Sequence, residues 1–369
     1  MRTSLAGGLL AAAFACGLSA TAAAQTKLTY GSYVPSTHVI NQDGIVPMAE
    51  HLEKASNGAL KMELFPGGAI AGGKGAVDQI RDGLVDSGLI VDAYVTRELP
   101  TSAMLTELGM VGTDSLVMTG ATNEYQLVDC EPCKKDLKEH GIMAMAYYAT
   151  APYMLLCNKE VKSLDDMKGL KVRATSGFGV MVKNMGGVPV NIASNEVYEA
   201  MQRGQADCTV GADAWLKSYT LWDVAKYVLD FPIGTYHSGL VFAIGADSWK
   251  KLPEEQKALI RDYMPKLVRT VAVGYLNEAK EAREGAAPHG VKFVPADPSF
   301  ADAFKKLQEA EVGRVVEASQ KKGVKNPEPI VKGYMDKVAK WTAIVAEING
   351  DPDKFEEALR REIYSKVKF

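Results

Sequence analysis

The chain has 369 residues, of which 47% are hydrophobic and 24% are charged, so it can bury a large core and is expected to divide into two lobes. Its formal net charge is −3 at pH 7, and no cluster of lysine and arginine with interleaved aromatic residues occurs along it. Charge and composition therefore argue against a nucleic-acid-binding protein.

Residues 1–24 have the features of a secretory signal peptide. Arg2 provides a positive start, residues 5–18 are small and apolar, and the alanines at 22–24 form an A-x-A cleavage site. Cleavage is predicted near Ala24. No later stretch approaches the ~20 apolar residues that a helix needs to cross a bilayer. The sequence therefore predicts a soluble protein that is exported to the periplasm.

From residue 25 onward, strand-like and helix-like patterns alternate, which predicts an α/β fold with mainly parallel sheets. In the first lobe, strands are expected at residues 27–34, 59–66 and 86–95, and helices at 38–56 and 73–84. Two more strands, 142–149 and 153–159, meet at Ala151 and Pro152, where the chain is expected to cross between lobes.

The same plan repeats in the second lobe. Strands are expected at residues 169–174, 188–192 and 206–212, and helices at 177–186, 194–204 and 220–228. A strand at 237–246 is expected to return to the first lobe. Lobe I is thus predicted to comprise residues 25–150 with a return segment of about 237–252, and lobe II residues 151–236.

Residues 253–369 are predicted to form a helical segment that bridges and packs on both lobes. Apolar residues recur at helical spacing through residues 253–287, and further helices are expected at 299–322 and 327–347, before a short charged tail. Pro265 interrupts the first of these patterns and is expected to kink or split that helix.

Few residues suggest catalysis, a metal or a cofactor. The five histidines have no zinc-ligand spacing, and there is no G-x-S-x-G elbow, P-loop or EF-hand loop. The glycine-rich segment 67–75 lacks the order of a phosphate-binding loop and is interpreted as a flexible connection between a strand and a helix. An enzyme is therefore not the leading hypothesis, and no metal or cofactor is predicted.

Four cysteines follow the signal peptide, an even number that is compatible with disulfides in an oxidising compartment. Cys130 and Cys133 form a CEPC sequence, but the preceding residues look helical, whereas a thioredoxin-type motif follows a strand. A local disulfide or two inert thiols is favoured, and a periplasmic thiol redox enzyme is the alternative. Cys157 and Cys208 fall in predicted strands and are interpreted as buried small hydrophobic residues.

The segment DDMKGLKVR, residues 165–173, ends a predicted strand on Arg173. A guanidinium stays charged at physiological pH, and its planar fork of donors matches a carboxylate. On this segment alone, a surface ion pair is the favoured interpretation. The residues that follow change that preference.

Residues 164–207 are similar to the signature of the solute-binding proteins of tripartite ATP-independent periplasmic (TRAP) transporters, of the C4-dicarboxylate-binding type. Three parts carry the resemblance: KGLKVR at 168–173, VPVNIASNEVYEAMQRGQAD at 188–207, and WKKLPEEQ at 249–256. With GIVPMAEHLEKASNGALKMELFPGG at 44–68, it extends over nearly all of the mature chain.

The resemblance implies a two-lobed periplasmic binding protein fold, with mixed sheets flanked by helices and long C-terminal helices bridging the lobes. It also implies a receptor that closes on a small organic acid, anchors the carboxylate on Arg173, and delivers the acid to a permease with small and large membrane subunits. A ligand-sensing subunit for a receptor kinase or chemoreceptor is an alternative with the same fold.

The chain departs from the family pattern at three places. Residues 208–211 replace the Q-E-N-P run of many members, so the asparagine that helps to hold the carboxylate is missing, and Asp213 or Trp215 is expected to line that part of the cleft. The Glu-Trp pair of members that bind 2-oxo acids through a cation is absent, which argues against a bound metal. The second arginine of sialic-acid-binding relatives has no counterpart at 149–153.

The remaining candidates are mostly aromatic, which suits an aromatic or branched monocarboxylate better than a dicarboxylate or sugar acid. These candidates are Tyr147, Tyr148, Tyr153, Trp215, Tyr219, Tyr236 and His237. For each one alone, core packing is the favoured interpretation. His38 is expected to add a polar contact from the first lobe, unless Ser36 or Thr37 simply caps the helix that begins there.

Overall fold

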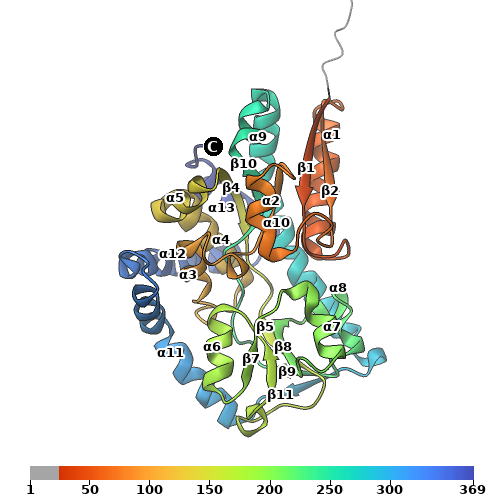
Figure 1. The fold of residues 1–369 in the computed structure, drawn as a ribbon, viewed down its shortest axis with the longest axis vertical. Helices are drawn as coiled ribbons and strands as arrows, with labels where there is room; N and C mark the ends of the chain where they lie inside the picture. Colours follow the sequence, from red (N-terminus) through yellow and green to blue (C-terminus); the bar gives the residue numbers. More distant parts are fainter. Residues whose placement is uncertain (1–24) are drawn as a thin grey trace, which may run out of the picture.

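The computed structural model describes residues 25–369 as two α/β lobes joined by long helices (Figure 1). One lobe contains a five-stranded sheet of order β2-β1-β3-β10-β4, and the other a six-stranded sheet of order β11-β9-β5-β8-β6-β7. The predicted two-lobed α/β architecture with mixed sheets is therefore confirmed. The predicted signal peptide lies outside the described residues.

The first sheet combines strands from distant parts of the chain. Its strands are β1 (Thr26–Gly31), β2 (Leu60–Phe65), β3 (Ser87–Ile90), β4 (Ile142–Tyr148) and β10 (Gly239–Gly245). Strand β1 pairs in parallel with β2 and β3, whereas β10 lies antiparallel between β3 and β4. Strands β3 and β10 are buried along their whole length, as expected for a sheet covered on both faces.

Short helices and turns connect these strands. They are η1 (Ile40–Ile45), α1 (Val46–Ala55), η2 (Gly73–Gly75), α2 (Ala76–Arg81), η3 (Asp92–Tyr94), α3 (Pro100–Thr106), α4 (Ser115–Glu124), η4 (Tyr125–Asp129) and α5 (Glu131–Glu139). The carboxylate of Asp114 caps α4 by accepting from the backbone N–H groups of Leu116 and Val117. The strand predicted at 86–95 ends at Ile90, and η3 takes its last part.

The second sheet is mixed as well. Its strands are β5 (Tyr153–Cys157), β6 (Lys171–Arg173), β7 (Val188–Val190), β8 (Cys208–Ala212), β9 (Tyr227–Asp230) and β11 (Lys292–Pro295). Strand β6 runs parallel to β7 and β8, and β5 runs antiparallel to β8 and β9. The connections include η5 (Asp165–Met167), α6 (Ser176–Asn184), η6 (Ser194–Glu196), α7 (Val197–Gln202), α8 (Trp215–Ser218) and η7 (Leu221–Asp223).

The helix predicted at residues 220–228 is wrong. Only the short turn η7 is helical there, and β9 follows it between β5 and β11. Val228 and Leu229 are buried in the sheet. Strand β11 was not predicted either, because its pairing with β9 joins segments more than sixty residues apart and leaves no local periodicity.

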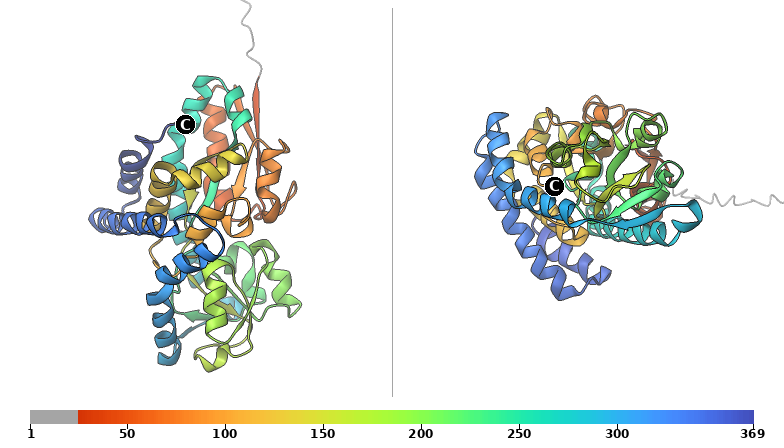
Figure 2. Two further views of the ribbon diagram at one scale, coloured as in Figure 1. Left: turned by 60° about the vertical axis from the view of Figure 1, so that its left-hand side comes forward. Right: turned by 90° about the horizontal axis from the view of Figure 1, so that it is seen from below.

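Long helices connect the two lobes. The helices of this part of the chain are α9 (Ala246–Lys251), α10 (Glu254–Glu284), η8 (Ala287–His289), α11 (Pro298–Lys321), α12 (Pro327–Ile348), α13 (Pro352–Leu359) and η9 (Arg360–Tyr364), of which α10, α11 and α12 are the long ones. Helix α10 packs on β4 in the first lobe and on α8 in the second. Figure 2 shows α11, α12 and α13, in blue, along one side of the molecule. None of the described helices has the length and apolar character of a membrane span.

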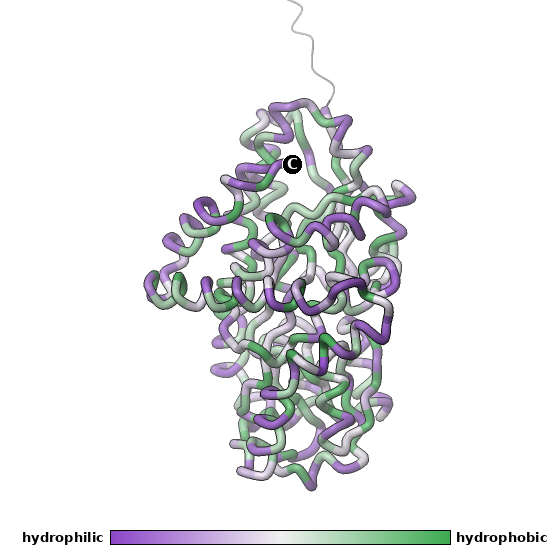
Figure 3. Tube along the Cα trace, turned by 90° about the vertical axis from the view of Figure 1, so that its left-hand side faces the viewer, coloured by the Kyte–Doolittle hydropathy of each residue, from purple (hydrophilic) through white to green (hydrophobic). Residues whose placement is uncertain are grey.

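Two expectations for the C-terminal part need correction. Helix α10 runs without a break through Pro265, so this residue does not split it. The expected charged tail forms α13, whose N-cap carboxylate, from Asp351, accepts from the backbone N–H groups of Asp353 and Lys354. Hydrophobic residues concentrate along the central strands of both lobes, and hydrophilic residues occupy the outer turns (Figure 3).

The four cysteines of the described chain form two disulfides. Cys130 pairs with Cys133, which confirms the local disulfide. Cys157 and Cys208 are buried, as predicted, and they pair in a disulfide that the sequence had left open. These two residues lie directly opposite each other on the antiparallel strands β5 and β8, where side chains on the same face approach closely.

Candidate functional site

A cavity of about 20 Å³ lies between the two lobes. The first lobe contributes Tyr33, His38, Val91, Tyr94 and Tyr148, the second contributes Tyr153, Arg173, Thr175, Ser194, Trp215 and Tyr219, and α10 contributes Tyr275. Thr150 and Tyr236 complete the lining from the two segments where the chain crosses between lobes. These segments are joined by the hydrogen bond from Thr150 N to Tyr236 O, at 2.9 Å.

Arg173 is the last residue of β6, which pairs in parallel with β7 and β8. It therefore lies at the carboxyl end of parallel strands, where ligands of α/β proteins commonly bind. Its side chain is 2% exposed. Its Nε donates to the carbonyl of Ile192 at 3.0 Å, and its Nη1 to that of Val210 at 3.4 Å. The guanidinium carbon lies 5.6 Å from the centre of the Trp215 ring, so the cation also faces an aromatic surface.

No carboxylate of residues 25–369 forms an ion pair with Arg173, although 29 such pairs occur elsewhere in that range. Its partners are carbonyl oxygens, a phenol and a ring. A buried cation without a counter-ion is costly to desolvate, and an anion that reaches it gains strong charge-assisted hydrogen bonds. The site can therefore take a carboxylate.

Two residues that were not predicted complete the polar end of the cavity. The hydroxyl oxygen of Tyr94 accepts from Arg173 Nη2 at 2.8 Å and from the backbone N–H of Ser194 at 2.9 Å. Ser194 Oγ lies 2.9 Å from the hydroxyl of Tyr219. Ser194 falls within the motif at 188–207, but its role was not apparent from the motif alone.

Aromatic rings form the rest of the wall. Trp215 meets Tyr153 and Tyr219 edge to face, at centroid distances of 5.4 and 5.3 Å. Tyr148 and Tyr275 stack in parallel at 6.1 Å. The indole Nε1 of Trp215 is buried and has no hydrogen-bond partner among the described residues. The cavity therefore offers flat aromatic faces, together with tyrosine hydroxyls and His38 as polar groups away from the Arg173 end.

His38 contributes a neutral polar group from the first lobe. Its Nε2 lies 3.3 Å from the hydroxyl of Tyr275, and its Nδ1 accepts from the backbone N–H of Ile40. Burial lowers the pKa of His38 to about 3, so the ring is uncharged at neutral pH. Burial raises the pKa of Tyr148 and Tyr219 well above the usual value, so these hydroxyls stay protonated. Arg173 is thus the one charged residue of the lining at neutral pH.

The cavity brings together most of the predicted site residues. Those that line it are His38, Tyr148, Tyr153, Arg173, Trp215, Tyr219 and Tyr236. Tyr147 and His237 are buried outside the lining; the ring nitrogens of His237 lie 3.2 and 3.1 Å from the carbonyl oxygens of Thr235 and Leu105.

Asp213 also lies outside the cavity, contrary to expectation. Its carboxylate accepts from Nε of Arg283 in α10 at 2.6 Å. The two residues are 70 positions apart, so no local pattern predicts this pairing. Asp213 therefore holds α10 against the second lobe.

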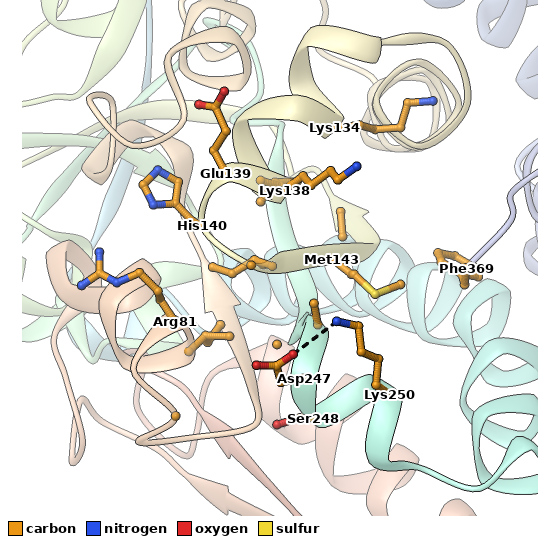
Figure 4. A pocket seen from close by; sticks show the side chains of 18 of the residues that line it. Arg81, Lys134, Lys138, Glu139, His140, Met143, Asp247, Ser248, Lys250 and Phe369 are labelled. Atoms are coloured by element: carbon orange, nitrogen blue, oxygen red, sulfur yellow. Dashed lines mark hydrogen bonds and ion pairs between the residues drawn. The ribbon is translucent and has the colours of Figure 1, made fainter.

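A larger hollow of about 1030 Å³ lies at the far end of the first lobe, between α2, α5, α9 and the C-terminal residues (Figure 4). Among its cations, Arg81 pairs with Asp78 at 2.8 Å and Lys250 with Asp247 at 3.4 Å, whereas Lys138, Lys251 and Lys368 form no ion pair with the described residues. These side chains are exposed, so water screens their charges and they hold an anion only weakly. Within residues 25–369, no group of three or more histidine, cysteine, aspartate or glutamate side chains is arranged to hold a metal ion.

Fold and site together define a two-lobed α/β binding protein whose interlobe cavity has a buried cation at one end and aromatic walls. Residues 30–318 match the family of bacterial extracellular solute-binding proteins, family 7 (DctP). The chain belongs to this family. Its members are transport solute-binding proteins and not enzymes, and the resemblance to TRAP receptors is confirmed.

Sequence relatives agree with this assignment. A solute-binding protein of Albidiferax ferrireducens is 27% identical over 214 residues, which cover 58% of this chain and 62% of the relative, less than two thirds of its length. The C4-dicarboxylate-binding periplasmic protein DctP of Rhodobacter capsulatus is 23% identical over 75% of this chain and 81% of its own.

Solved structures share the fold. A TRAP periplasmic solute-binding protein of Bordetella bronchiseptica with bound mandelate has a TM-score of 0.72 at 24% identity, over 85% of this chain and 99% of its own. A TRAP protein of Rhodoferax ferrireducens with copurified benzoate has a TM-score of 0.77 at 18% identity, over 87% and 100%. A marine metagenome protein with 3-hydroxybenzoate has a TM-score of 0.75 at 22% identity, over 86% and 99%.

Proposed function

We propose that this protein is a periplasmic receptor that binds a small organic acid between its lobes, holds the carboxylate on Arg173, and delivers the acid to a TRAP permease. The buried guanidinium without a carboxylate partner is the observation that carries this proposal. Charged hydrogen bonds contribute about 1.5–3 kcal/mol each, and a closed cavity protects them from water.

The ligand is an aromatic or branched monocarboxylate. With Arg173 as the one cation of the lining, a second carboxylate would be buried without a partner, which is costly. The walls formed by Trp215, Tyr153 and Tyr148 suit an apolar or flat body. The structural neighbours that hold mandelate, benzoate and 3-hydroxybenzoate support this class.

Closure couples binding to transport. The cavity of about 20 Å³ has room for about one water molecule, so an organic acid enters only when the lobes or the lining side chains move apart. An acid that contacts residues of both lobes favours the closed form through that differential affinity. The permease then recognises the closed receptor.

Two alternatives have different support. The thiol redox enzyme is disfavoured, because Cys130 and Cys133 are 1% and 0% exposed and a reactive cysteine needs access. A receptor that feeds a sensor kinase or chemoreceptor would use the same cavity. Genes for a small and a large membrane subunit beside this one would favour the permease.

A thermal-shift screen tests the ligand class. We expect benzoate, mandelate and 3-hydroxybenzoate to raise the melting temperature of the mature protein in a concentration-dependent way, because a ligand that binds only the folded state stabilises it by mass action. Succinate and malate serve as dicarboxylate controls and should shift it less. The proposed class is wrong if the dicarboxylates give the larger shift, and the proposed function is wrong if no organic acid gives any.

A further inference from the structure

Tyr94 differs from every other residue that lines the cavity. It lies in the turn η3 directly after β3, and it is the one lining residue that is only partly buried. The ring of Tyr33 packs against it edge to face, at a centroid distance of 5.6 Å. Tyr94 therefore stands at the boundary between the cavity and solvent, on the side of the first lobe.

The hydroxyl of Tyr94 occupies an anion position. A guanidinium N–H of Arg173 and the backbone N–H of Ser194 both donate to this single oxygen, at 2.8 and 2.9 Å. Convergent N–H donors of this kind are the partners that a carboxylate oxygen takes in proteins. Both donors belong to the second lobe, so this oxygen joins the two lobes at the point where the ligand carboxylate is expected.

The neighbouring loop leaves space for this arrangement. A side chain on Gly73 would place its Cβ 2.8 Å from Cδ2 of Tyr94, closer than unstrained contacts allow. The glycine-rich segment 67–75, which binds no phosphate in our interpretation, thus has a packing role beside the Tyr94 ring. A methyl group at Gly73 would push the ring away from its present position.

We propose that Tyr94 is an internal ligand of the closed receptor: its hydroxyl fills the carboxylate position on Arg173 and Ser194, and an incoming acid displaces it. This inference rests on the proposed function, because it takes Arg173 as the anchor. Without solute, the tyrosine links the two lobes. With solute, it competes with the acid, so the apparent affinity falls as the fraction of receptor in which Tyr94 already fills the carboxylate position rises.

The competing arrangement is one in which Tyr94 stays in place and donates its hydrogen to the bound carboxylate. The two arrangements predict opposite signs for one substitution. If the hydroxyl competes, Tyr94→Phe tightens binding; if it donates to the ligand, the same change weakens binding.

The experiment combines ligand-free and ligand-bound measurements on the mature protein. Small-angle scattering without ligand and calorimetry with 3-hydroxybenzoate and mandelate are carried out on Tyr94→Phe and Gly73→Ala. The control Tyr227→Phe makes the same chemical change in β9, outside the cavity. We expect both test variants to have a larger radius of gyration than wild type without ligand, and a dissociation constant at least about threefold lower. The control should match wild type.

Each other outcome overturns the inference. If Tyr94→Phe raises the dissociation constant, the hydroxyl of Tyr94 contacts the bound acid and does not compete with it. An unchanged radius of gyration and unchanged affinity make its hydrogen bonds incidental. If wild type binds none of the acids, the proposed function fails, and the ligand-free scattering alone still decides whether Tyr94 holds the lobes together.

Discussion

Two buried charges in this molecule have opposite surroundings. The carboxylate of Glu124, at the end of α4, accepts from the ammonium groups of Lys337 and Lys340 and from the indole N–H of Trp341, all at 2.8 Å. Arg173, equally buried, has no such counter-charge among the described residues. The first charge is satisfied within the protein, whereas the second keeps the capacity to bind something else.

The difference separates the structural charge of Glu124 from the charge of Arg173, which we propose for ligand binding. Glu124 holds α12 on α4, where the ring of Trp341 also packs so closely on Gly120 that a Cβ there would lie 2.1 Å from it. Burial raises the pKa of Glu124, but hydrogen bonds from Lys337 and Lys340 lower it further, to below its usual value. A group that is already compensated gains nothing from a ligand, so only Arg173 is expected to determine affinity.

The largest expected effect is that of Arg173→Ala on ligand affinity. Truncation leaves the ligand carboxylate without its partner, at a cost of roughly 2–5 kcal/mol, so the affinity should fall by about thirtyfold or more. Calorimetry with 3-hydroxybenzoate measures this change. Arg81→Ala removes an exposed arginine in α2 and serves as the control. If Arg173→Ala keeps the affinity within about threefold, the assignment of the anchor is wrong.

Glu124→Gln should have the opposite profile. It removes a charge on which two lysines converge, and we expect the free energy of unfolding to fall by about 1–3 kcal/mol while the affinity stays unchanged. Urea unfolding checks the stability, and Glu317→Gln, in an exposed pair on α11, is the control. If Glu124→Gln lowers the affinity and leaves the stability unchanged, Glu124 is not a structural charge and does not differ from Arg173 in the way described.

The pH dependence of stability gives this contrast a second test. Because the pKa of Glu124 is lower in the folded than in the unfolded protein, its contribution is present above the unfolded value and is lost as the pH falls through the folded value. Glu124→Gln should therefore cost more stability at neutral pH than in acid. Equal losses at both pH values would show that the carboxylate charge does not matter.

A smaller effect is expected from the aromatic wall. Trp215→Leu removes one aromatic face of the cavity. The affinity for 3-hydroxybenzoate should fall by about fivefold, since an aromatic contact contributes about 0.5–1.5 kcal/mol. A small acid such as lactate should be affected less. Trp222→Leu, where the ring stacks on His289 outside the cavity, is the control. If Trp215→Leu lowers the affinity for both acids equally, Trp215 supports the position of Arg173 and does not contact the aromatic body of the ligand.

The smallest expected effect is no change at all. Arg173 is charged at every physiological pH, and burial holds the pKa of His38 at about 3 and raises those of Tyr148 and Tyr219. The dissociation constant should therefore stay constant between about pH 5.5 and about pH 8, measured by calorimetry in matched buffers. A tenfold change in this range would point to a titrating group at the anchor.

Much of the fold was predictable, because its signals are local. The strands β1, β2, β4 and β5 and the helices α11 and α12 begin and end within a few residues of the predicted bounds. The failures share a cause. Strand β9 needs β5 and β11 on either side, and the disulfide of Cys157 and Cys208 needs β5 to lie beside β8. Such pairings depend on which strands meet, which local periodicity does not show.

The site divides in the same way. Arg173 could be proposed as the anchor from the sequence, because its motif is contiguous and a guanidinium has the same chemistry wherever it lies. Tyr94 was missed because its two hydrogen bonds span 79 and 100 positions. Asp213 was misplaced because Arg283, far along the chain in α10, binds it.

The sequence by itself determined the family, the alternation of strands and helices, and the position of the cation that we propose as the ligand anchor, since each follows from contiguous residues. Tertiary structure alone decided that this cation lacks a counter-charge and that the hydroxyl of a tyrosine of the opposite lobe accepts from its Nη2 and from the backbone N–H of Ser194. The reason is physical: the identity of a charged group is local, whereas the cost of burying it depends on every atom that the fold brings near it.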